Sequence, residues 1–246
     1  MDRFLYTAMA GAKQLMQAQA LNSHNLANVS TTGFRSELAA VRSAPIVGAG
    51  YPTRVFPQTE LGVTNLNQGT KEVTGRELDV ALGGDGWIAV VADDGTEAYT
   101  RAGDLRIGSG RILTTGTGNL VLGSKGPIAI PPAQKIDVAA DGNITIIPEG
   151  EAPNNTTRVD RIKLVNPPLE NMVKGHDGLM RTRDNAPAAA DTGVTLVSGS
   201  LESSNVNAVD GLVNMISLAR QYEAQIKLMR AAEDNDAAMT RAMGLS

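Results

Sequence analysis

The chain of 246 residues contains no cysteine. This absence excludes disulfide bonds, thiolate catalysis and metal sites with cysteine ligands. Aromatic residues are scarce as well, at 3% of the chain, whereas hydrophobic residues make up 42%. A core must therefore be built largely from Val, Ile, Leu, Ala and Met. A chain of this length can bury one ample core or two small ones.

The sequence has no run of basic residues, and its 22 Lys and Arg against 26 Asp and Glu give a formal net charge of −4. Nucleic-acid binding draws most of its affinity from clustered Lys and Arg, so this function is not expected. No apolar stretch is long enough to predict a membrane span. Asp2 stands where a secretion signal would be basic, and Gln14, Gln17 and Gln19 interrupt the apolar stretch that follows. A cleaved signal peptide is therefore not expected.

Proline and glycine are nearly missing from both ends of the chain. All 11 prolines lie between Pro45 and Pro187, and most glycines lie between Gly33 and Gly199. Residues 3–28 and 212–243 therefore read as long helices, and the middle reads as a separate, β-rich part. Such a division is typical of an assembly subunit rather than of an enzyme.

Each predicted helix carries one apolar seam with alternating spacings of four and three residues. We expect subunits to pack on Leu5, Met9, Ala12, Met16 and Leu26 in the first helix, and on Leu212, Met215, Ile216, Ala219, Tyr222, Ile226 and Met229 in the second. Two interpretations remain open. The helices either close a monomer as an intramolecular hairpin, or form a coiled coil that also packs against neighbouring subunits. The small residues and methionines of the seams favour the second interpretation, because methionine adapts to non-identical partners.

The middle of the chain reads as an extended connector followed by many short strands. Proline and glycine punctuate residues 36–75, and from Gly75 onward short alternating runs are separated by Gly-containing turns. The predicted fold class is α+β, with terminal helices that form a coiled-coil domain and a central all-β sandwich or distorted barrel. The predicted domain ranges are 1–35 with 200–246 for the coiled coil, 36–75 for the connector and 76–199 for the β-rich domain.

A search for chemistry finds no catalytic constellation, cofactor motif or metal site. Four aspartates stand next to glycine, where Asp is favoured for backbone hydrogen bonds in turns; they are Asp85, Asp94, Asp141 and Asp177. The two histidines, His24 and His176, have no metal-ligand spacing and are expected at the surface or at an interface. Trp87 opens a predicted strand, so its side chain is expected in the core rather than at a binding site where it would stack on a sugar.

Two segments resemble the signature motifs of the bacterial flagellar axial proteins, and in particular of the basal-body rod family. The N-terminal motif is carried by Asn25, Leu26, Ala27, Asn28, Thr31, Gly33, Phe34 and Arg35, and the C-terminal motif by Leu201, Glu202, Ser204, Asn205 and Val206. Stretches of the middle, among them Tyr99–Gly103, are similar to the domain that hook and rod proteins share. The opening residues, Met1 to Gly11, are more similar to proximal than to distal rod proteins.

This resemblance implies a structural subunit of the proximal rod that assembles axially with other proximal and distal rod proteins and transmits torque. It also implies export through the flagellar type III apparatus without a cleaved signal, and a place in the periplasmic part of the basal body. Gly33 would supply a turn, Phe34 an apolar anchor, and Asn205 or Asn207 the N-cap of the second helix. Two alternatives stay open: a distal rod protein, and a β domain that binds or cleaves peptidoglycan and carries helical oligomerisation arms.

Overall fold

The computed structural model describes residues 2–45, 55–152 and 155–244, and these form two compact units. The helical unit comprises residues 1–28, 36–65 and 206–246, and the body unit comprises residues 29–35 and 66–205. The helical unit contains α1 (Asp2–Ala27), the strands β1 (Glu37–Pro45) and β2 (Val55–Thr64), and α2 (Ala208–Met243).

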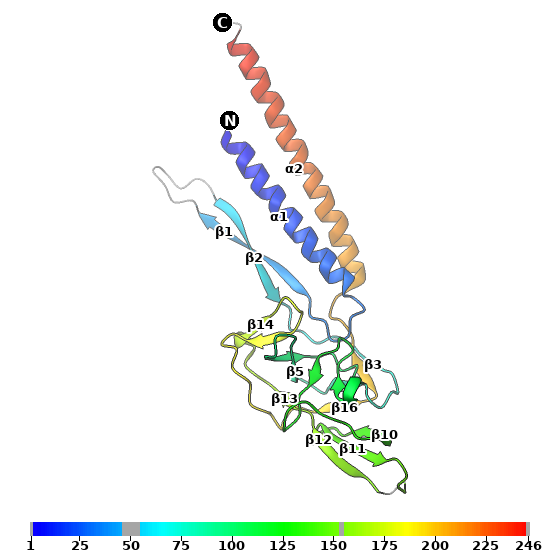
Figure 1. Cartoon of the computed structure of the whole chain (residues 1–246). Coiled ribbons are helices and arrows are strands. Elements are labelled where there is room, and N and C mark those ends of the chain that lie inside the picture. The colour runs from blue at the N-terminus through cyan, green and yellow to red at the C-terminus, as the bar shows by residue number, and fades with distance from the viewer. Residues whose placement is uncertain (1, 46–54, 153–154, 245–246) are drawn as a thin grey trace. The chain divides into compact units, whose positions relative to one another are not determined.

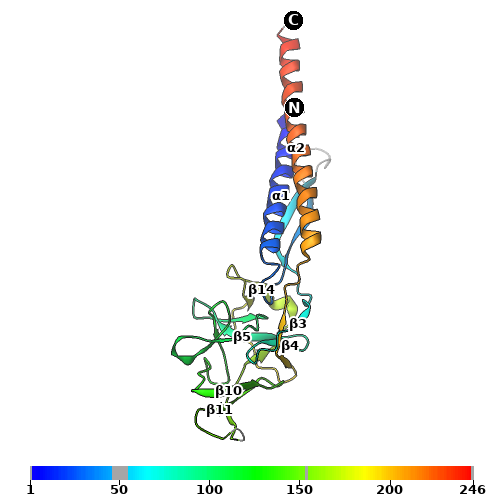
Figure 2. The same ribbon diagram turned by 90° about the vertical axis from the view of Figure 1, so that its right-hand side faces the viewer.

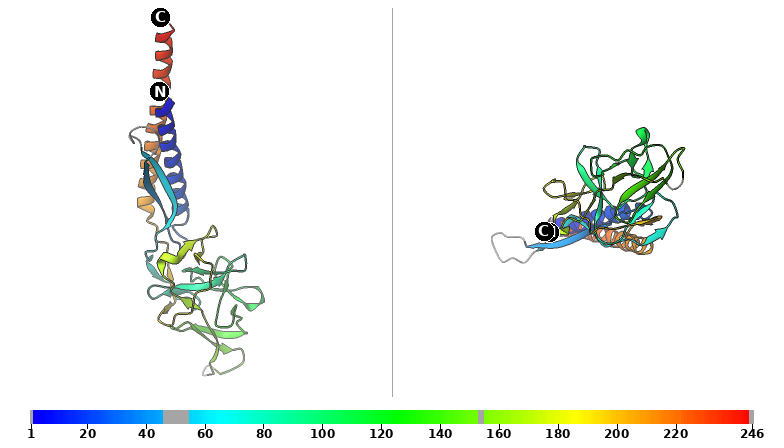
Figure 3. Two further views of the ribbon diagram at one scale, coloured as in Figure 1. Left: turned by 90° about the vertical axis from the view of Figure 1, so that its left-hand side faces the viewer. Right: turned by 90° about the horizontal axis from the view of Figure 1, so that it is seen from below.

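In the helical unit, α1 and α2 lie side by side, and the antiparallel hairpin of β1 and β2 lies beside α1 (Figures 1 and 2). The 36-residue α2 is longer than the 26-residue α1, and its C-terminal turns extend past the start of α1 (Figure 3). Residues 36–65, which follow the N-terminal motif in the sequence, thus contribute a β-hairpin to the helical unit.

Small residues let the two helices approach each other closely. Ala8 and Ala12 are buried, and a Cβ atom added to Gly11 would lie 3.6 Å from the side chain of Gln225 on α2. Gly211, which is also buried, faces Leu26 at a similar distance. Small side chains at these positions lower the steric cost of packing helix backbones together.

The N-terminus of α2 is capped by Asn207. Its Oδ1 accepts a hydrogen bond from the backbone N–H of Val209 at 3.0 Å and of Asp210 at 3.5 Å, which satisfies donors that the first helical turn leaves unpaired. One of the two caps expected from the sequence is thus confirmed.

The body unit is built from short strands joined by turns. The strands are β3 (Lys71–Val73), β4 (Val80–Leu82), β5 (Trp87–Val91), β6 (Glu97–Thr100), β7 (Arg106–Ile107), β8 (Leu113–Thr114), β9 (Leu120–Val121), β10 (Ala133–Val138), β11 (Asn143–Pro148), β12 (Thr157–Arg161), β13 (Leu164–Val165), β14 (Met172–Lys174), β15 (Met180–Thr182), β16 (Leu196–Ser198) and β17 (Ser200–Glu202). Two short 3-10 turns, Ser109–Arg111 and Leu169–Asn171, interrupt them.

The largest sheet runs β14-β15-β6-β5-β9-β8-β7, with β13 added to β5. A three-stranded sheet of β10, β11 and β12 and two strand pairs, β16 with β4 and β17 with β3, complete the unit. Aliphatic side chains such as Ile88, Leu113 and Ile144 fill the main core. Trp87 and Tyr99 lie in a second, smaller cluster, so the core position expected for the tryptophan is confirmed.

The expected coiled-coil domain is wrong. The terminal helices share their unit with a β-hairpin, and the predicted seam does not form a common buried stripe. Met9, Met16, Leu212 and Ile216 are each more than half exposed. Of the predicted seam of α1, Ala12 and Leu26 are protected, together with Ala8, Leu15 and Asn22, because one face of this helix meets α2 while another lies against the hairpin.

The expected sandwich or distorted barrel is also wrong. Within the described residues, the end strands of the largest sheet, β14 and β7, do not pair with each other, and the remaining strands form separate small sheets. Strands of two to six residues turn away before they can close a ring, since closure needs a continuous staggered register around all strands. No helix among the described residues is both long and apolar enough to cross a bilayer.

The packing of the helical unit makes a testable prediction. Ala12 is 6% exposed, so Ala12→Glu must force the helices apart or bury a charge, and we expect it to cost about 2 kcal/mol or more of stability. Met9→Glu, at a position 52% exposed, is the control and should change stability little. Thermal unfolding of the purified monomer, followed by circular dichroism, measures both. Equal melting temperatures for the two variants would contradict the packing described here.

Candidate functional site: the junction of the terminal motifs

The N-terminal motif begins at the end of α1, where Asn25 ties the helix to the hairpin. Its Nδ2 donates to the carbonyl of Glu37 at 2.7 Å, and its Oδ1 accepts from the Glu37 N–H at 3.0 Å. Three residues later, Nδ2 of Asn28 donates to the carbonyl of His24 at 2.9 Å. Both asparagines thus hold backbone groups at the point where the helix stops.

Gly33 lies where only glycine fits. Its φ is +67°, and an added Cβ would lie 2.4 Å from the carbonyl carbon of Arg101 and from the nitrogen of Ala102. Its N–H donates to the carbonyl of Glu202 at 2.8 Å. Left-handed backbone and close approach both favour glycine. At this residue the N-terminal motif meets both the C-terminal motif and the two residues that follow β6.

Phe34 and Arg35 hold the same segment against the body unit. The ammonium of Lys174 lies 4.1 Å from the centre of the Phe34 ring and donates to the Arg35 carbonyl at 2.9 Å. The N–H of Asn205 donates to the Phe34 carbonyl at 3.3 Å. A cation over an aromatic face is attracted by the ring quadrupole, so the ring of Phe34 has a polar partner in addition to the apolar role expected of it.

The C-terminal motif begins within β17, which pairs with β3 so that Glu202 stands opposite Lys71. Ser200, Glu202 and Ser204 are buried, whereas Leu201 is only partly so. Because successive side chains of a strand point to opposite faces, the polar residues of this segment face inward.

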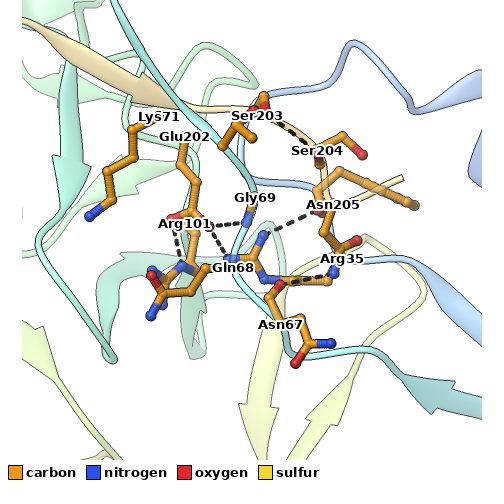
Figure 4. Close-up of polar contacts among 12 residues, drawn as sticks. Arg35, Asn67, Gln68, Gly69, Lys71, Arg101, Glu202, Ser203, Ser204 and Asn205 are labelled. Carbon is orange, nitrogen blue, oxygen red and sulfur yellow. Dashed lines mark hydrogen bonds and ion pairs between the residues drawn. The ribbon is translucent and has the colours of Figure 1, made fainter. Parts of the chain in front are cut away.

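Glu202 lies between two guanidinium groups inside the body unit (Figure 4). Its Oε1 accepts from Nη2 of Arg35 and from the backbone N–H of Gly69 at 2.8 Å, and its Oε2 accepts from Nε of Arg101 at 2.8 Å. The side chains of Glu202, Arg35 and Arg101 are 0%, 2% and 3% exposed. We call these three residues and Gly69 the Glu202 cluster.

Arg101 also spans the turn before β5. Its Nη1 and Nη2 donate to the carbonyls of Gly86 and Gly84, each at 2.9 Å, and its guanidinium carbon lies 5.6 Å from the ring centre of Trp87. A planar guanidinium with several donors suits such a buried site better than an ammonium group would.

The charges in the cluster set the ionisation of Glu202. Burial by itself would raise the pKa of the carboxyl, but the charges of Arg35 and Arg101 outweigh burial, and the pKa lies below its ordinary value. One carboxylate therefore stays ionised between two cations. Removing one member of such a group leaves a buried charge without compensation.

The structure brings together part of the residues that the sequence singles out. Gly33, Phe34, Arg35, Glu202 and Asn205 meet in the body unit. Among the predicted packing residues, Ala12 is buried, and the partly buried ones are Leu26, Met215, Ala219, Tyr222, Ile226 and Met229. Met9, Met16, Leu212 and Ile216 are exposed, and the side chain of Leu5 lies outside the described residues.

Sequence reasoning missed two members of the cluster, Gly69 and Arg101. Arg101 falls in a stretch that already stood out by resemblance, Tyr99–Gly103, but nothing local to it indicates burial. Gly69 would meet the carbonyl oxygen of Ser203 at 2.0 Å if it carried a Cβ. That constraint comes from a residue more than a hundred positions away, so it leaves no local signal.

Three of the four aspartates next to glycine make the hydrogen bonds of a turn, whereas Asp85 accepts one from the side chain of Gln68. Asp94, Asp141 and Asp177 each accept a hydrogen bond from the backbone N–H two residues further on, at 2.9 to 3.1 Å. This is the Asx-turn arrangement expected of them. Within the described residues, no three His, Asp or Glu side chains gather to hold a metal ion.

Two terminal helices paired in one unit, and a β-rich body in which both terminal motifs meet, are the layout of a structural subunit. Three family models match the chain: the flagella basal body rod protein model over residues 5–35, the flagellar hook protein FlgE/F/G D1 domain over 81–146, and the flagellar basal body rod FlgEFG protein C-terminal model over 197–242.

Full-length relatives agree with these models. The flagellar basal-body rod proteins FlgF of Salmonella typhimurium and of Escherichia coli are each 38% identical to this chain, over the whole of both sequences. FlgG of Bacillus subtilis, also a flagellar basal-body rod protein, is 29% identical and covers 95% of this chain and 96% of its own. The chain belongs to the flagellar basal-body rod protein family and resembles its FlgF members.

Gly33 offers a first test of the junction. Gly33→Ala adds a methyl group that collides with Arg101 and Ala102, in a backbone conformation that costs an L-residue about 1 kcal/mol or more. Gly75→Ala is a matched control, because Gly75 has a similar φ of +73° but open space around it. We expect Gly33→Ala to lower the denaturant midpoint clearly more than Gly75→Ala does. Similar midpoints for the two variants would show that the close approach of Gly33 to Arg101 and Ala102 does not require glycine.

Glu202 offers a second test, with a defined pH dependence. Glu202→Gln removes the charge at nearly constant volume, and we expect it to cost about 3–5 kcal/mol at neutral pH, the usual cost of breaking a buried ion pair. The exposed neighbour Glu72 on β3 provides the control, Glu72→Gln. Chemical denaturation followed by tryptophan fluorescence measures both.

The sign of the pH effect follows from the lowered pKa. The unfolded chain holds its Glu202 proton up to a higher pH, about 4.3, than the folded chain does. The stabilisation is therefore complete above that pH and is lost as the pH falls through the folded-state pKa. The stability difference between wild type and Glu202→Gln should shrink on acidification below about pH 4. A difference independent of pH would contradict an ionised, stabilising Glu202.

Proposed function

We propose that this chain is a structural subunit of the bacterial flagellar rod, that it occupies the proximal part, and that it transmits torque along the axis together with other rod subunits. Membership of the rod family supports the structural role, and the full-length similarity to FlgF proteins supports the proximal position. The observation that carries the proposal is the amount of apolar surface that the helical unit leaves uncovered.

On α1, Met9 and Met16 are 52% and 56% exposed. They are seven residues apart and therefore lie on one helix face. On α2, four large apolar residues within eight positions are exposed, namely Val209, Leu212, Val213 and Ile216, at 51% to 68%. Their spacing also places them on one face, which we call the outer face of α2.

The outer face lies opposite the residues that meet α1. Gly211 is buried and approaches Leu26 of α1. Met215 and Tyr222, which the helical spacing places on the same side of α2, are partly covered, whereas Leu212 and Ile216 are exposed. A helix that is apolar on both sides is normally buried on both sides. The outer face at the first turns of α2 is therefore expected to be buried against another molecule, and we propose that this molecule is a neighbouring rod subunit.

The C-terminal turns of α2 also support contacts with other subunits. Beyond Met229 nearly every residue is exposed, and Met239 and Met243 are 51% and 72% exposed. This part of the helix extends past α1 (Figure 2), so it lacks the packing that the rest of the helix receives. Long isolated helices gain most of their stability from tertiary contacts, which further rod subunits would supply.

The resemblance also supplies the setting of the proposal. The subunit would leave the cytoplasm through the flagellar type III export apparatus without a cleaved signal. It would then join the rod in the periplasm, in contact with proximal and distal rod proteins.

The outer face of α2 provides the test. We expect Ile216→Glu to prevent swimming and rod completion in a bacterium that lacks its own FlgF-type protein, because a charge on this face cannot be buried against a neighbour. Asn214→Glu, at an exposed polar position two residues away, should support both. Swimming in soft agar and electron microscopy of purified basal bodies are the measurements.

Monomer stability must be checked alongside, because the proposal places Ile216 at an intermolecular contact. Both variants should melt like the wild type. Normal rods built from Ile216→Glu would disprove the contact. Wild-type protein that restores only strains lacking a distal rod protein would disprove the proximal position.

A further inference from the structure

The chain passes between its helical unit and its body unit four times, after residues 28, 35, 65 and 205. Any force that acts on one unit can reach the other through the covalent chain at these four crossings. The contacts next to each crossing, on the body side, therefore decide how such a force enters the body.

All four crossings lead to Glu202 within a few residues. Gly33, after the first crossing, donates its N–H to the Glu202 carbonyl at 2.8 Å. Arg35, before the second, donates Nη2 to Oε1 of Glu202. Gly69, after the third, donates its N–H to the same Oε1 at 2.8 Å, and Glu202 itself stands three residues before the fourth.

These segments touch each other backbone to backbone. A Cβ on Gly33 would meet Arg101 and Ala102 at 2.4 Å, and a Cβ on Gly69 would meet the Ser203 oxygen at 2.0 Å. Arg101 extends the contact towards the sheet, since it binds Oε2 of Glu202 (Figure 4) and also donates to the Gly86 carbonyl in the turn before β5. One segment cannot shift without disturbing the others.

We infer that Glu202 is a mechanical anchor that fastens the body-side ends of all four crossings to one another and to the main sheet. The inference rests on the proposed function in one respect: a rod subunit that transmits torque must pass force between its two units, and this is the purpose of the anchor. Without the carboxylate, the hydrogen bonds of Arg35, Gly69 and Arg101 to it are lost together. A load on α2 would then be resisted only by the pairing of β17 with β3 and by backbone contacts such as those of Gly33 to the Glu202 carbonyl and of Asn205 to the Phe34 carbonyl.

A pulling experiment on the full-length monomer tests the anchor. Because the chain has no cysteine, introduced cysteines give unique attachment points. One pair, Arg220→Cys on α2 with Lys135→Cys on β10, pulls across the crossings. A second pair, Lys135→Cys with Glu170→Cys, pulls within the body, and all three positions are exposed.

We expect Glu202→Gln to raise the unfolding rate at fixed force by at least about tenfold when the pull crosses the units, and clearly less when it acts within the body. Glu202→Asp keeps the charge on a shorter side chain, so its unfolding rate across the units should lie between those of the wild type and of Glu202→Gln. It also serves as the second variant if Glu202→Gln folds poorly.

Glu97→Gln is the matched control. Glu97 forms an ion pair with Lys163 at 2.7 Å in the body unit, away from the crossings. Its loss should have the same effect in both pulling directions. If Glu202→Gln likewise affects both directions equally, the residue only stabilises the fold and the anchor is refuted.

The outcome is independent of the rod assignment. The pulling experiment uses an isolated monomer, so it can overturn the anchor while wild-type protein still builds rods. Conversely, wild-type protein that fails to build rods would overturn the proposed function, whatever the pulling rates show.

Discussion

A single buried carboxylate between two guanidinium groups holds the body together where its ends meet. Such an arrangement is costly to desolvate and is stable only when every partner is present. Here the partners come from residue 35, from residue 101 and from residue 202. The first and last parts of the body must therefore both be in place before the cluster can form. This requirement also explains why the two signature motifs, far apart in sequence, lie side by side.

The sequence predicts elements well where local rules decide. Helix 3–28 appears as α1, helix 212–243 lies within α2, and the strand predicted to open at Trp87 appears as β5, because proline-free periodic stretches and Gly-rich turns are local signals. The hairpin of β1 and β2 lacks such signals, because Pro45 and Pro57 lie in its strands. The hairpin lies against α1, and such a long-range contact is not encoded by a local pattern.

The predicted seam of α1 divides between two surfaces. Ala12 is buried and Leu26 is partly buried within the helical unit, together with Ala8 and Leu15, whereas Met9 and Met16 are exposed. Close approach of the helices favours small side chains, so the larger methionines are turned outward. At the candidate site, too, burial does not follow hydrophobicity, because Ser200 and Glu202 are buried and Leu201 is only partly buried. The burial of a charged residue such as Glu202 can be predicted only when its partners, which are distant in the sequence, are known.

The position of Arg101 has an optical consequence. It binds Glu202 and lies 5.6 Å from the ring centre of Trp87, the chain's one tryptophan. Indole emission responds to nearby charge and to water, so the molecule carries a natural fluorophore beside its central ion cluster. Changes at the meeting point of the two termini can thus be followed by light, without any attached dye.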